Sequence, residues 1–350
     1  MLNSPTVREA LLYEVEGEGM VRCLLCGRGC VIPDGGEGFC GTRRNVNGRL
    51  YTMVYGDVSS ISANPIEKKP FYHFWAGGLA LTVGSWSCNF TCPWCQNWEI
   101  SKVKPDPCNP NFISVKEFME LMGRMGCNGT SMSFNEPTLL FEYSLDLFRE
   151  ASKKGYYNTF VSNGYMSEGA LRMLASAGLD AINIDVKGDG VAVEKFCGAD
   201  LEIVWRNIGL AKRLGLHVEV VTLVIPGVNS SPETLKEIAI RLLAEAGPDT
   251  PIHFTRFHPS YRMTDRPSTD IKLLEGAREI AVREGVNYAY VGNVPGHPYE
   301  NTYCPKCGGL LLARLGFSLI GSKVLDGRFC ASCGEEIPIK GKIRLKRPIP

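Results

Sequence analysis

Short apolar segments alternate with amphipathic ones through the middle of the chain. The apolar segments are rich in β-branched and aromatic residues and have no polar face, which is typical of buried parallel strands. We expect such strands at residues 79–83, 129–134, 158–162, 180–186, 217–225, 251–257 and 286–291.

The segments between these strands have recognisable helix ends. Ser114 and Glu117 are spaced as a capping box ahead of one helix, and Ser231 followed by Pro232 begins another. Strand and helix alternate about six times, which predicts right-handed crossovers in either a doubly wound sheet or a (β/α) barrel. No GxGxxG or Walker loop follows any of the strands, so the barrel is favoured.

Both ends of the chain differ from this alternating part because cysteines are concentrated there. We therefore expect an α/β chain with a partial (β/α)6 TIM-type barrel at residues 76–300. A cysteine-rich metal-binding module with a polar lead-in occupies residues 1–75, and a zinc-ribbon-like module occupies residues 301–350.

The charge of the chain excludes some classes of partner. A net charge of +1 over 350 residues gives no electrostatic footprint for nucleic acid or for an anionic membrane. The N-terminus lacks the basic start and apolar core of a signal peptide. The uncharged run at 74–98 is interrupted by glycines, Asn89 and Pro93, so we do not expect a membrane helix. The sequence predicts a cytoplasmic protein.

The cysteines are too numerous for an ordinary chain of this kind. Of the fourteen, eleven fall into three groups: Cys23, Cys26, Cys30 and Cys40; Cys88, Cys92 and Cys95; and Cys304, Cys307, Cys330 and Cys333. Clustered C-x-x-C pairs in a cytosolic chain favour metal sites over disulfides. Cys108, Cys127 and Cys197 remain, and we expect them to be small buried hydrophobic residues.

The central group has only three cysteines, in the order C-x-x-x-C-x-x-C. A metal held by three protein ligands keeps one coordination position open. In a cubane iron–sulfur cluster, three cysteines hold three irons and leave the fourth iron free. The alternative is a partial zinc knuckle whose fourth ligand is distant in sequence. Because the motif follows the first barrel strand, where barrel enzymes carry their chemistry, we favour the cluster.

This motif, with Trp94 before its last cysteine, resembles the signature of the radical S-adenosylmethionine (SAM) enzymes, and the resemblance covers roughly residues 50–300. The segments "CPWCQNWEIS" and "SFNEPTLLFEY" look like those of glycyl-radical-enzyme activases. The segments "CLLCGRGCVIPDGGEGFCGTRRN", "NPIEKKPFYHF" and "RFHPSYRM" are more similar to the radical enzyme of the AmmeMemoRadiSam system.

The resemblance implies a reaction and its cofactors. A 4Fe–4S cluster at the three cysteines would bind SAM and cleave it with one electron. The resulting 5′-deoxyadenosyl radical would take a hydrogen atom from a substrate that the resemblance does not identify. It also implies a one-electron donor of the flavodoxin or ferredoxin type, with Memo-like and AMMECR-like proteins as candidate partners.

Residues after several strands match the family pattern. Phe134 and Asn135 replace two glycines of the family's G-G-E-P motif, in which Glu136 would accept from the methionine ammonium. The other matched positions, expected around SAM, are Ser162 and Asn163 near the carboxylate, Asp185 and Lys187 at the methionine end, Val224 against adenine, and His258 near the adenosyl group.

The two flanking cysteine quartets have different spacings. Cys304 and Cys307, with Cys330 and Cys333, form two C-x-x-C-G knuckles, which predict structural zinc. The quartet of Cys23, Cys26, Cys30 and Cys40 is spaced less regularly. It is open to zinc or to an auxiliary iron–sulfur cluster, and the spacing slightly favours zinc, since it lacks the closely repeated cysteines of ferredoxins.

Basic residues beyond the sixth strand suggest what the substrate carries. Arg256 or Arg262 could clamp a carboxylate or phosphate, although either could instead pair with Asp265 or another acidic residue. We therefore expect an anionic substrate. Two other functions remain open: an activase acting on a protein glycine, and a non-catalytic zinc or iron–sulfur scaffold.

Overall fold

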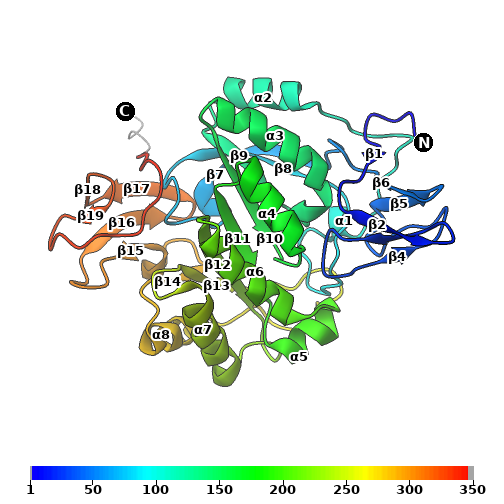
Figure 1. Cartoon of the computed structure of the whole chain (residues 1–350). Coiled ribbons are helices and arrows are strands. Elements are labelled where there is room, and N and C mark those ends of the chain that lie inside the picture. The colour runs from blue at the N-terminus through cyan, green and yellow to red at the C-terminus, as the bar shows by residue number, and fades with distance from the viewer. Residues whose placement is uncertain (1, 346–350) are drawn as a thin grey trace.

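A computed structural model of the chain describes residues 2–345 and is built around one eight-stranded sheet (Figure 1). The strands are β7 (Ser60–Pro65), β8 (Leu79–Gly84), β9 (Gly129–Met132), β10 (Tyr157–Ser162), β11 (Ala181–Asp185), β12 (His217–Val224), β13 (Ile252–Arg256) and β14 (Ala289–Gly292). Strands β8 to β14 run parallel, and β7 pairs antiparallel with β8. Strand order across the sheet follows chain order without reversal, as in a barrel wall. Because β7 and β14 form its two edges, the barrel is partial, as predicted.

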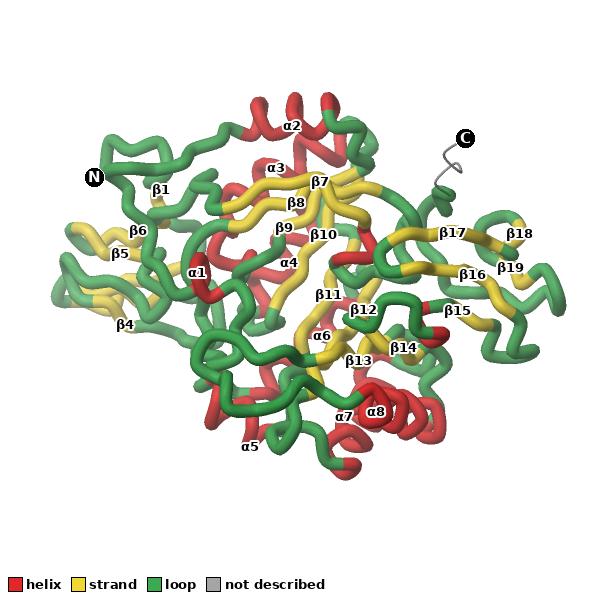
Figure 2. Tube along the Cα trace, turned by 180° about the vertical axis from the view of Figure 1, so that it is seen from behind, coloured by secondary structure: helices red, strands yellow, loops and turns green. Residues whose placement is uncertain are grey.

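Helices cover the outer face of this curved sheet, whereas loops cross its inner side (Figure 2). The short helix α1 (Trp98–Ser101) lies among those loops. The other helices are α2 (Val115–Arg124), α3 (Phe141–Lys153), α4 (Glu168–Ala177), α5 (Gly190–Ala192), α6 (Leu201–Arg213), α7 (Pro232–Ala246) and α8 (Ile271–Glu284). The predicted capping box opens α2, where Ser114 accepts from the Glu117 amide and Glu117 accepts from the Ser114 amide. Across residues 2–345, no helix combines the length and hydrophobicity needed to cross a membrane.

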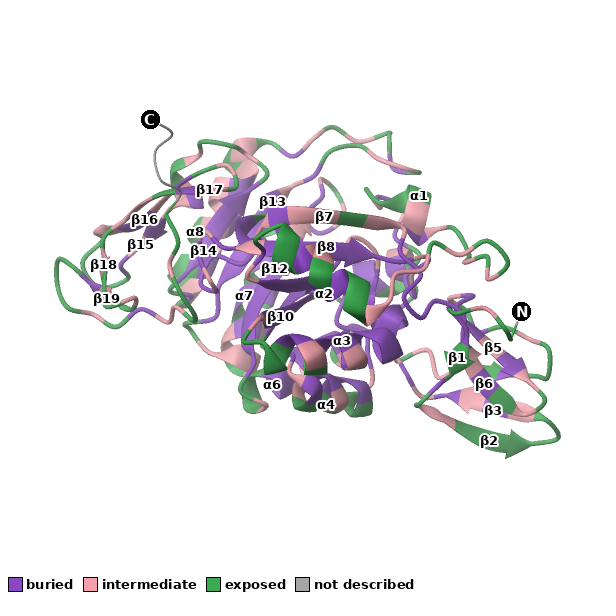
Figure 3. Ribbon diagram, turned by 90° about the horizontal axis from the view of Figure 1, so that it is seen from above, coloured by how far each residue is buried: buried purple, intermediate pink, exposed green. Residues whose placement is uncertain are grey.

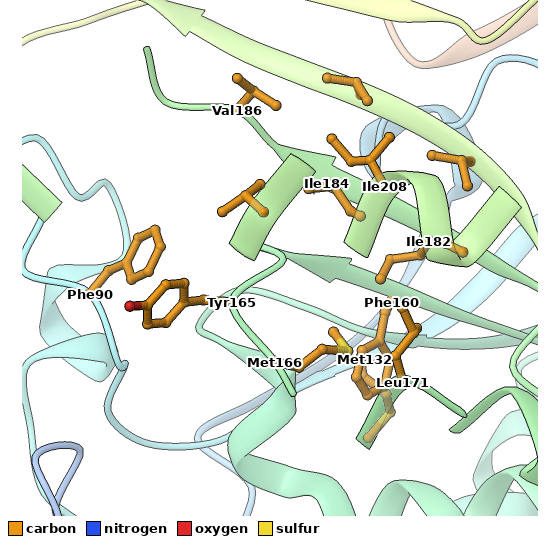
Figure 4. Close-up of a cluster of buried hydrophobic side chains, with 14 of the residues drawn as sticks. Phe90, Met132, Phe160, Tyr165, Met166, Leu171, Ile182, Ile184, Val186 and Ile208 are labelled. Carbon is orange, nitrogen blue, oxygen red and sulfur yellow. The ribbon is translucent and has the colours of Figure 1, made fainter. Parts of the chain in front are cut away.

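The main core lies between the sheet and these helices (Figure 4). Met132, Phe160 and Ile182 come from three neighbouring strands and are fully buried. Leu171 of α4 and Ile208 of α6 belong to the same cluster. Strands with apolar residues on both faces can only be stable when both faces are covered, which explains why the predicted strands read as continuous apolar runs.

The N-terminal part forms two small three-stranded sheets beside the barrel (Figure 3). Their strands are β1 (Arg8–Glu9), β2 (Tyr13–Gly17), β3 (Met20–Cys23), β4 (Val31–Ile32), β5 (Arg43–Val46) and β6 (Arg49–Thr52). Buried Arg43 forms an ion pair with Glu142 of α3, with 2.7 Å between Nη1 and Oε1. This pair attaches the N-terminal sheets to the barrel. The segment expected as a polar lead-in also contains β7, an edge strand in which Ile61 and Ala63 alternate with polar residues.

The C-terminal part is a second small β-module on the opposite side of the barrel (Figures 1 and 3). Its strands are β15 (Thr302–Tyr303), β16 (Leu310–Leu315), β17 (Ser318–Ser322), β18 (Val324–Leu325) and β19 (Phe329–Cys330). Leu311, Leu312 and Leu319 form a separate small core with Tyr72. Buried Arg314 donates to the Tyr72 carbonyl at 2.8 Å, which connects this module to the segment before β8.

Candidate active site

A cavity of about 480 Å³ lies inside the partial barrel. Its upper wall is made by the carboxyl ends of the parallel strands, and its floor by the segment between β7 and β8. Ten of the predicted site residues line it: Cys88, Cys92, Trp94, Cys95, Asn135, Glu136, Ser162, Asn163, Asp185 and Lys187. Parallel strands end at one edge of a sheet, so residues that are far apart in sequence meet there.

The three central cysteines lie on the loop between β8 and α1. Cys92 is buried, while Cys88 and Cys95 are partly exposed to the cavity. Burial raises the pKa of the Cys88 thiol to about 12. A bound metal ion supplies the positive charge that deprotonates such a thiol. The backbone amide of Phe90 donates to Cys88 Sγ at 3.4 Å, a contact that suits a thiolate ligand.

Cys197 lies next to this loop, which the sequence did not indicate. Its sulfur is 3.5 Å from Cys92 Sγ, and both side chains are buried. The expectation of a small buried residue is correct for Cys197 and Cys127, but Cys108 is exposed. The contact with Cys92 joins residues 105 positions apart, so no local pattern could predict it.

Asn135 holds the cysteine loop in place. Its side-chain oxygen accepts from the Ser85 amide at 2.9 Å, and its nitrogen donates to the carbonyls of Trp86 and Ser87 at 3.1 and 2.9 Å. Phe134, which replaces a glycine of the family pattern, has φ of 71°. It therefore keeps a left-handed conformation that glycine adopts without strain.

Glu136 is the most constrained acidic residue of the cavity wall. One of its oxygens accepts from the Ser162 hydroxyl at 2.7 Å and from Thr138 at 2.6 Å, and the other accepts from the Asn163 amide at 2.8 Å. Burial raises the pKa of Glu136, while these hydrogen bonds oppose the shift. The side chain of Asn163 in turn donates to Asn89 at 2.7 Å, which connects this wall to the cysteine loop.

Asp185 and Lys187 form an ion pair on the cavity wall after β11, with 3.1 Å between carboxylate and ammonium. Burial lowers the pKa of Lys187, but Asp185 and the nearby sulfurs raise it overall. The lysine therefore stays protonated and places a fixed positive charge beside Cys92.

Four predicted residues are not among those that line the cavity. Val224 is buried on the opposite face of β12, because side chains alternate along a strand and Val221 and Leu223 face inward. His258 is exposed and contacts Ser268.

The two arginines expected to clamp the substrate also lie outside the cavity. Arg256 donates to the Thr269 carbonyl at 2.9 Å, and exposed Arg262 lies over the Tyr261 ring at 5.1 Å. Within residues 2–345, neither forms an ion pair with Asp265, which was the alternative to a substrate contact. The loop itself does approach the site, because the Arg262 amide donates to the Pro93 carbonyl at 2.9 Å.

Lys69, on the cavity floor, was missed by the sequence analysis. It is only 3% exposed, and its ammonium lies 4.9 Å from the Phe134 ring centre. Within residues 2–345 its ammonium has no ion-pair or hydrogen-bond partner, and only its backbone amide is bonded, to the Ile66 carbonyl. Burial, with a smaller contribution from Lys68, lowers its pKa to about 7. The only available signal was two adjacent lysines in a segment otherwise rich in aromatic residues.

His253 is a second missed residue of the cavity. Its Nε2 lies 2.7 Å from a carboxylate oxygen of Glu219, which also contacts His217 at 2.9 Å. Glu219 is fully buried, and hydrogen bonds with the two histidines lower its pKa despite burial. His253 lines the cavity, and Glu219 behind it holds the imidazole in position.

The two cysteine quartets have different geometries. The sulfurs of Cys304, Cys307, Cys330 and Cys333 all lie within 4.8 Å of one another. The closest pairs, Cys304–Cys333 and Cys307–Cys330, are 3.6 and 3.7 Å apart. Such a set is able to hold one metal ion. The N-terminal quartet lines a separate small cavity against the barrel.

Comparison with known proteins agrees with this geometry. The family model of the Radical SAM superfamily matches residues 86–242, which include the three central cysteines and most of the cavity wall. The chain therefore belongs to the radical SAM superfamily, whose members use an iron–sulfur cluster to cleave SAM reductively. It is 42% identical over 334 residues to an uncharacterized protein of Methanocaldococcus jannaschii, covering 95% of this chain and 99% of the relative.

Two solved structures are similar to this chain at low identity. SuiB of Streptococcus suis bound to S-adenosylmethionine is similar with a TM-score of 0.50 and 12% identity, over 69% of this chain and 56% of SuiB. A radical SAM methyltransferase from Sphaerobacter thermophilus has a TM-score of 0.49 and 12% identity, over 87% of this chain and 81% of its own.

Proposed function

We propose that the cavity is the active site of a radical SAM enzyme and that Cys88, Cys92 and Cys95 ligate its 4Fe–4S cluster. The observation that carries this proposal is that the three cysteines share one cavity with Glu136 and Asn163. Three thiolates leave one iron open, and acidic and amide groups next to it suit an amino acid group. When bound, the cluster and SAM supply a 5′-deoxyadenosyl radical that takes a hydrogen atom from the substrate.

The residues of the chain then bind SAM and hold it in one orientation. Glu136 would accept from the methionine ammonium, and four donor groups of Thr138, Ser162 and Asn163 hold its carboxylate in position. Ser162 and Asn163 lie near the carboxylate, and Lys187 adds positive charge on that side. The buried walls exclude water from the radical.

The substrate in this proposal carries an anionic group, and Lys69 takes the role first given to Arg256 and Arg262. Lys69 is a cavity-lining lysine without a protein counter-ion. A bound carboxylate or phosphate would pair with it and raise its pKa from about 7, so the lysine would be protonated in the complex.

A single anaerobic assay tests the function. The reconstituted chain, reduced with dithionite in the presence of SAM, should form 5′-deoxyadenosine. Replacing Cys88, Cys92 or Cys95 by Ala should abolish this product, whereas Cys108→Ala should leave it unchanged, because Cys108 is exposed. Product formation by a variant lacking all three central cysteines would disprove the ligand assignment. Iron-free preparations with no SAM cleavage would instead support the scaffold function.

The activase function makes a different prediction with a protein substrate. A reduced activase would give a stable glycine-centred doublet in electron paramagnetic resonance spectra when incubated with a glycyl-radical protein. We expect no doublet here, since the cavity presents Lys69 to a small anionic substrate. Memo-like and AMMECR-like proteins are the candidate partners, and a flavodoxin or ferredoxin type of protein is the candidate electron donor. Adding a true partner should raise the yield of 5′-deoxyadenosine.

Zinc is the metal we propose for the C-terminal quartet. A tetrahedron with Zn–S bonds of about 2.3 Å places its sulfurs about 3.8 Å apart. The two closest sulfur pairs, at 3.6 and 3.7 Å, agree with that spacing. Such a site would stabilise the small core of the C-terminal module, which contains two of the four cysteines.

A further inference from the structure

A short π-helical turn places Cys197 against the loop that carries the three central cysteines. The turn is Val193–Cys197, and it directly follows α5. Gly198 ends it with φ of 61°, a left-handed conformation that suits glycine. Turns of this kind are rare and are frequently found at functional sites. Cys197 is the last residue of the turn, and its side chain is fully buried.

Hydrogen bonds to backbone carbonyls attach this turn to the rest of the site. The Thr91 amide donates to the Cys197 carbonyl at 3.2 Å. Arg28 donates to the carbonyls of Cys197 and Gly198 at 3.3 and 2.6 Å. Thr91 directly precedes Cys92 in the chain, so these contacts fix the position of the Cys197 side chain relative to that of Cys92.

The sulfurs of Cys92 and Cys197 are close enough to share a hydrogen bond. They are 3.5 Å apart, and both side chains are buried. When Cys92 ligates iron, its sulfur is a thiolate and carries no proton. The thiol of Cys197 is then the donor and the Cys92 sulfur is the acceptor. The Phe90 amide donates in the same way to Cys88 Sγ, at 3.4 Å.

We propose that Cys197 is a positioning residue of the catalytic centre and that its thiol donates a hydrogen bond to the Cys92 thiolate. This inference rests on the proposed function, since the contact matters only if Cys92 is a cluster ligand. A donor that faces a ligand sulfur stabilises the more negative, reduced cluster and so raises its reduction potential. No bond of Cys197 is made or broken in this role.

The midpoint potential of the cluster tests this role without a turnover assay. Reconstituted wild type, Cys197→Ala and Cys197→Ser are titrated anaerobically, and the reduced-cluster signal that SAM perturbs is followed by electron paramagnetic resonance. Cys197→Ala removes the donor, so the equilibrium constant for reduction should fall by about three- to tenfold, a shift of about 30 to 60 mV for one electron. Cys197→Ser keeps a hydroxyl donor and should stay within about twofold of wild type.

Cys127→Ala is the matched control, because it also removes a buried cysteine. Cys127 lies just before β9, at the amino end of the parallel strands, whereas the cavity lies at their carboxyl ends. Its substitution should leave the midpoint potential at the wild-type value. A shift in this control as large as that of Cys197→Ala would mean that the loss of any buried cysteine has the same effect, and it would overturn the inference.

Two results for Cys197 itself would also overturn the inference. One is a wild-type potential in Cys197→Ala, and the other is an equal loss in Cys197→Ala and Cys197→Ser. If Cys197→Ala does not fold, electron–nuclear double resonance in D2O decides, since the deuteron couplings of wild type and Cys197→Ser should differ, and identical couplings would contradict the contact. A wild type that assembles no cluster would instead count against the proposed function.

Discussion

Replacing Lys69 by Met should stabilise the protein, and the gain should depend on pH. In the folded chain, burial lowers the Lys69 pKa from 10.5 to about 7. Unfolding exposes the side chain and restores its ordinary value. Between these two pKa values the unfolded chain therefore binds a proton at Lys69 that the folded chain does not. Wild-type stability falls as pH drops through this window, and the penalty is complete below the folded pKa.

The size of the Lys69 pKa shift determines how much the buried lysine lowers the free energy of unfolding. Each pKa unit corresponds to about 1.4 kcal/mol, so the full penalty is about 5 kcal/mol. Methionine has a similar length and no charge to desolvate. Between about pH 9.5 and about pH 7.5, the advantage of Lys69→Met over wild type should grow by about 3 kcal/mol.

Anaerobic urea denaturation at these two pH values measures the free energy of unfolding. Lys68→Met is the matched control, because Lys68 is the adjacent residue and is exposed. Its difference from wild type should change much less between the two pH values, because Lys68 makes only the smaller contribution to the pKa shift of Lys69. The reasoning is refuted if the Lys69→Met difference does not change with pH, or if Lys68→Met changes equally. The first result would mean that Lys69 is charged in the folded protein, and the second that the pH dependence does not come from the burial of Lys69. In a turnover assay, Lys69→Met should still cleave SAM, but it should no longer convert an anionic substrate along with that cleavage.

Two further substitutions test other parts of the assignment. Glu136→Gln removes a charge-assisted contact to the SAM ammonium and places an amide nitrogen near the donors of Glu136, so equilibrium dialysis should show SAM binding weakened by about 10- to 100-fold. Exposed Glu120→Gln is the control, and equal loss in both variants would argue against a specific contact. Cys307→Ser should lower zinc by about one ion per chain and leave iron unchanged in elemental analysis. Loss of iron in that variant would contradict the zinc assignment.

The fold was predictable because its strands are buried on both faces. Apolar runs with clear helix ends between them predict parallel strands in chain order, and the carboxyl end of each strand then becomes a candidate position in the site. Glu136, Ser162 and Asp185 line the cavity for this reason. The reasoning was less accurate within a strand. One position decides which face a side chain occupies, so Val224 is buried behind the sheet and Leu223 faces the cavity.

The sequence patterns could not predict contacts between segments that are distant along the chain. Arg256 and Arg262 looked suited to an anion because they are close in sequence, but their guanidinium groups contact a backbone carbonyl and a tyrosine ring. Lys69 reaches the cavity from a connection that precedes the first parallel strand. Nothing in the residues next to Lys69 or Cys197 shows which side chains face them, because that depends on how the barrel closes.

The three cysteine groups show how the same ligand can serve different purposes in one chain. Both quartets begin with C-x-x-C, but the C-terminal one closes with a second C-x-x-C, so two similar turns bring four sulfurs within 4.8 Å. The N-terminal one closes with Cys30 and Cys40 on separate turns, and its cysteines line a small cavity instead. The C-terminal group lies across the barrel from the loop that carries the three central cysteines (Figure 1), whereas the N-terminal group shares its cavity with Asn89 of that loop. The two quartets therefore differ in position as well as in spacing along the chain, and a ligand change in the N-terminal one is the more direct way to disturb the central cysteine loop.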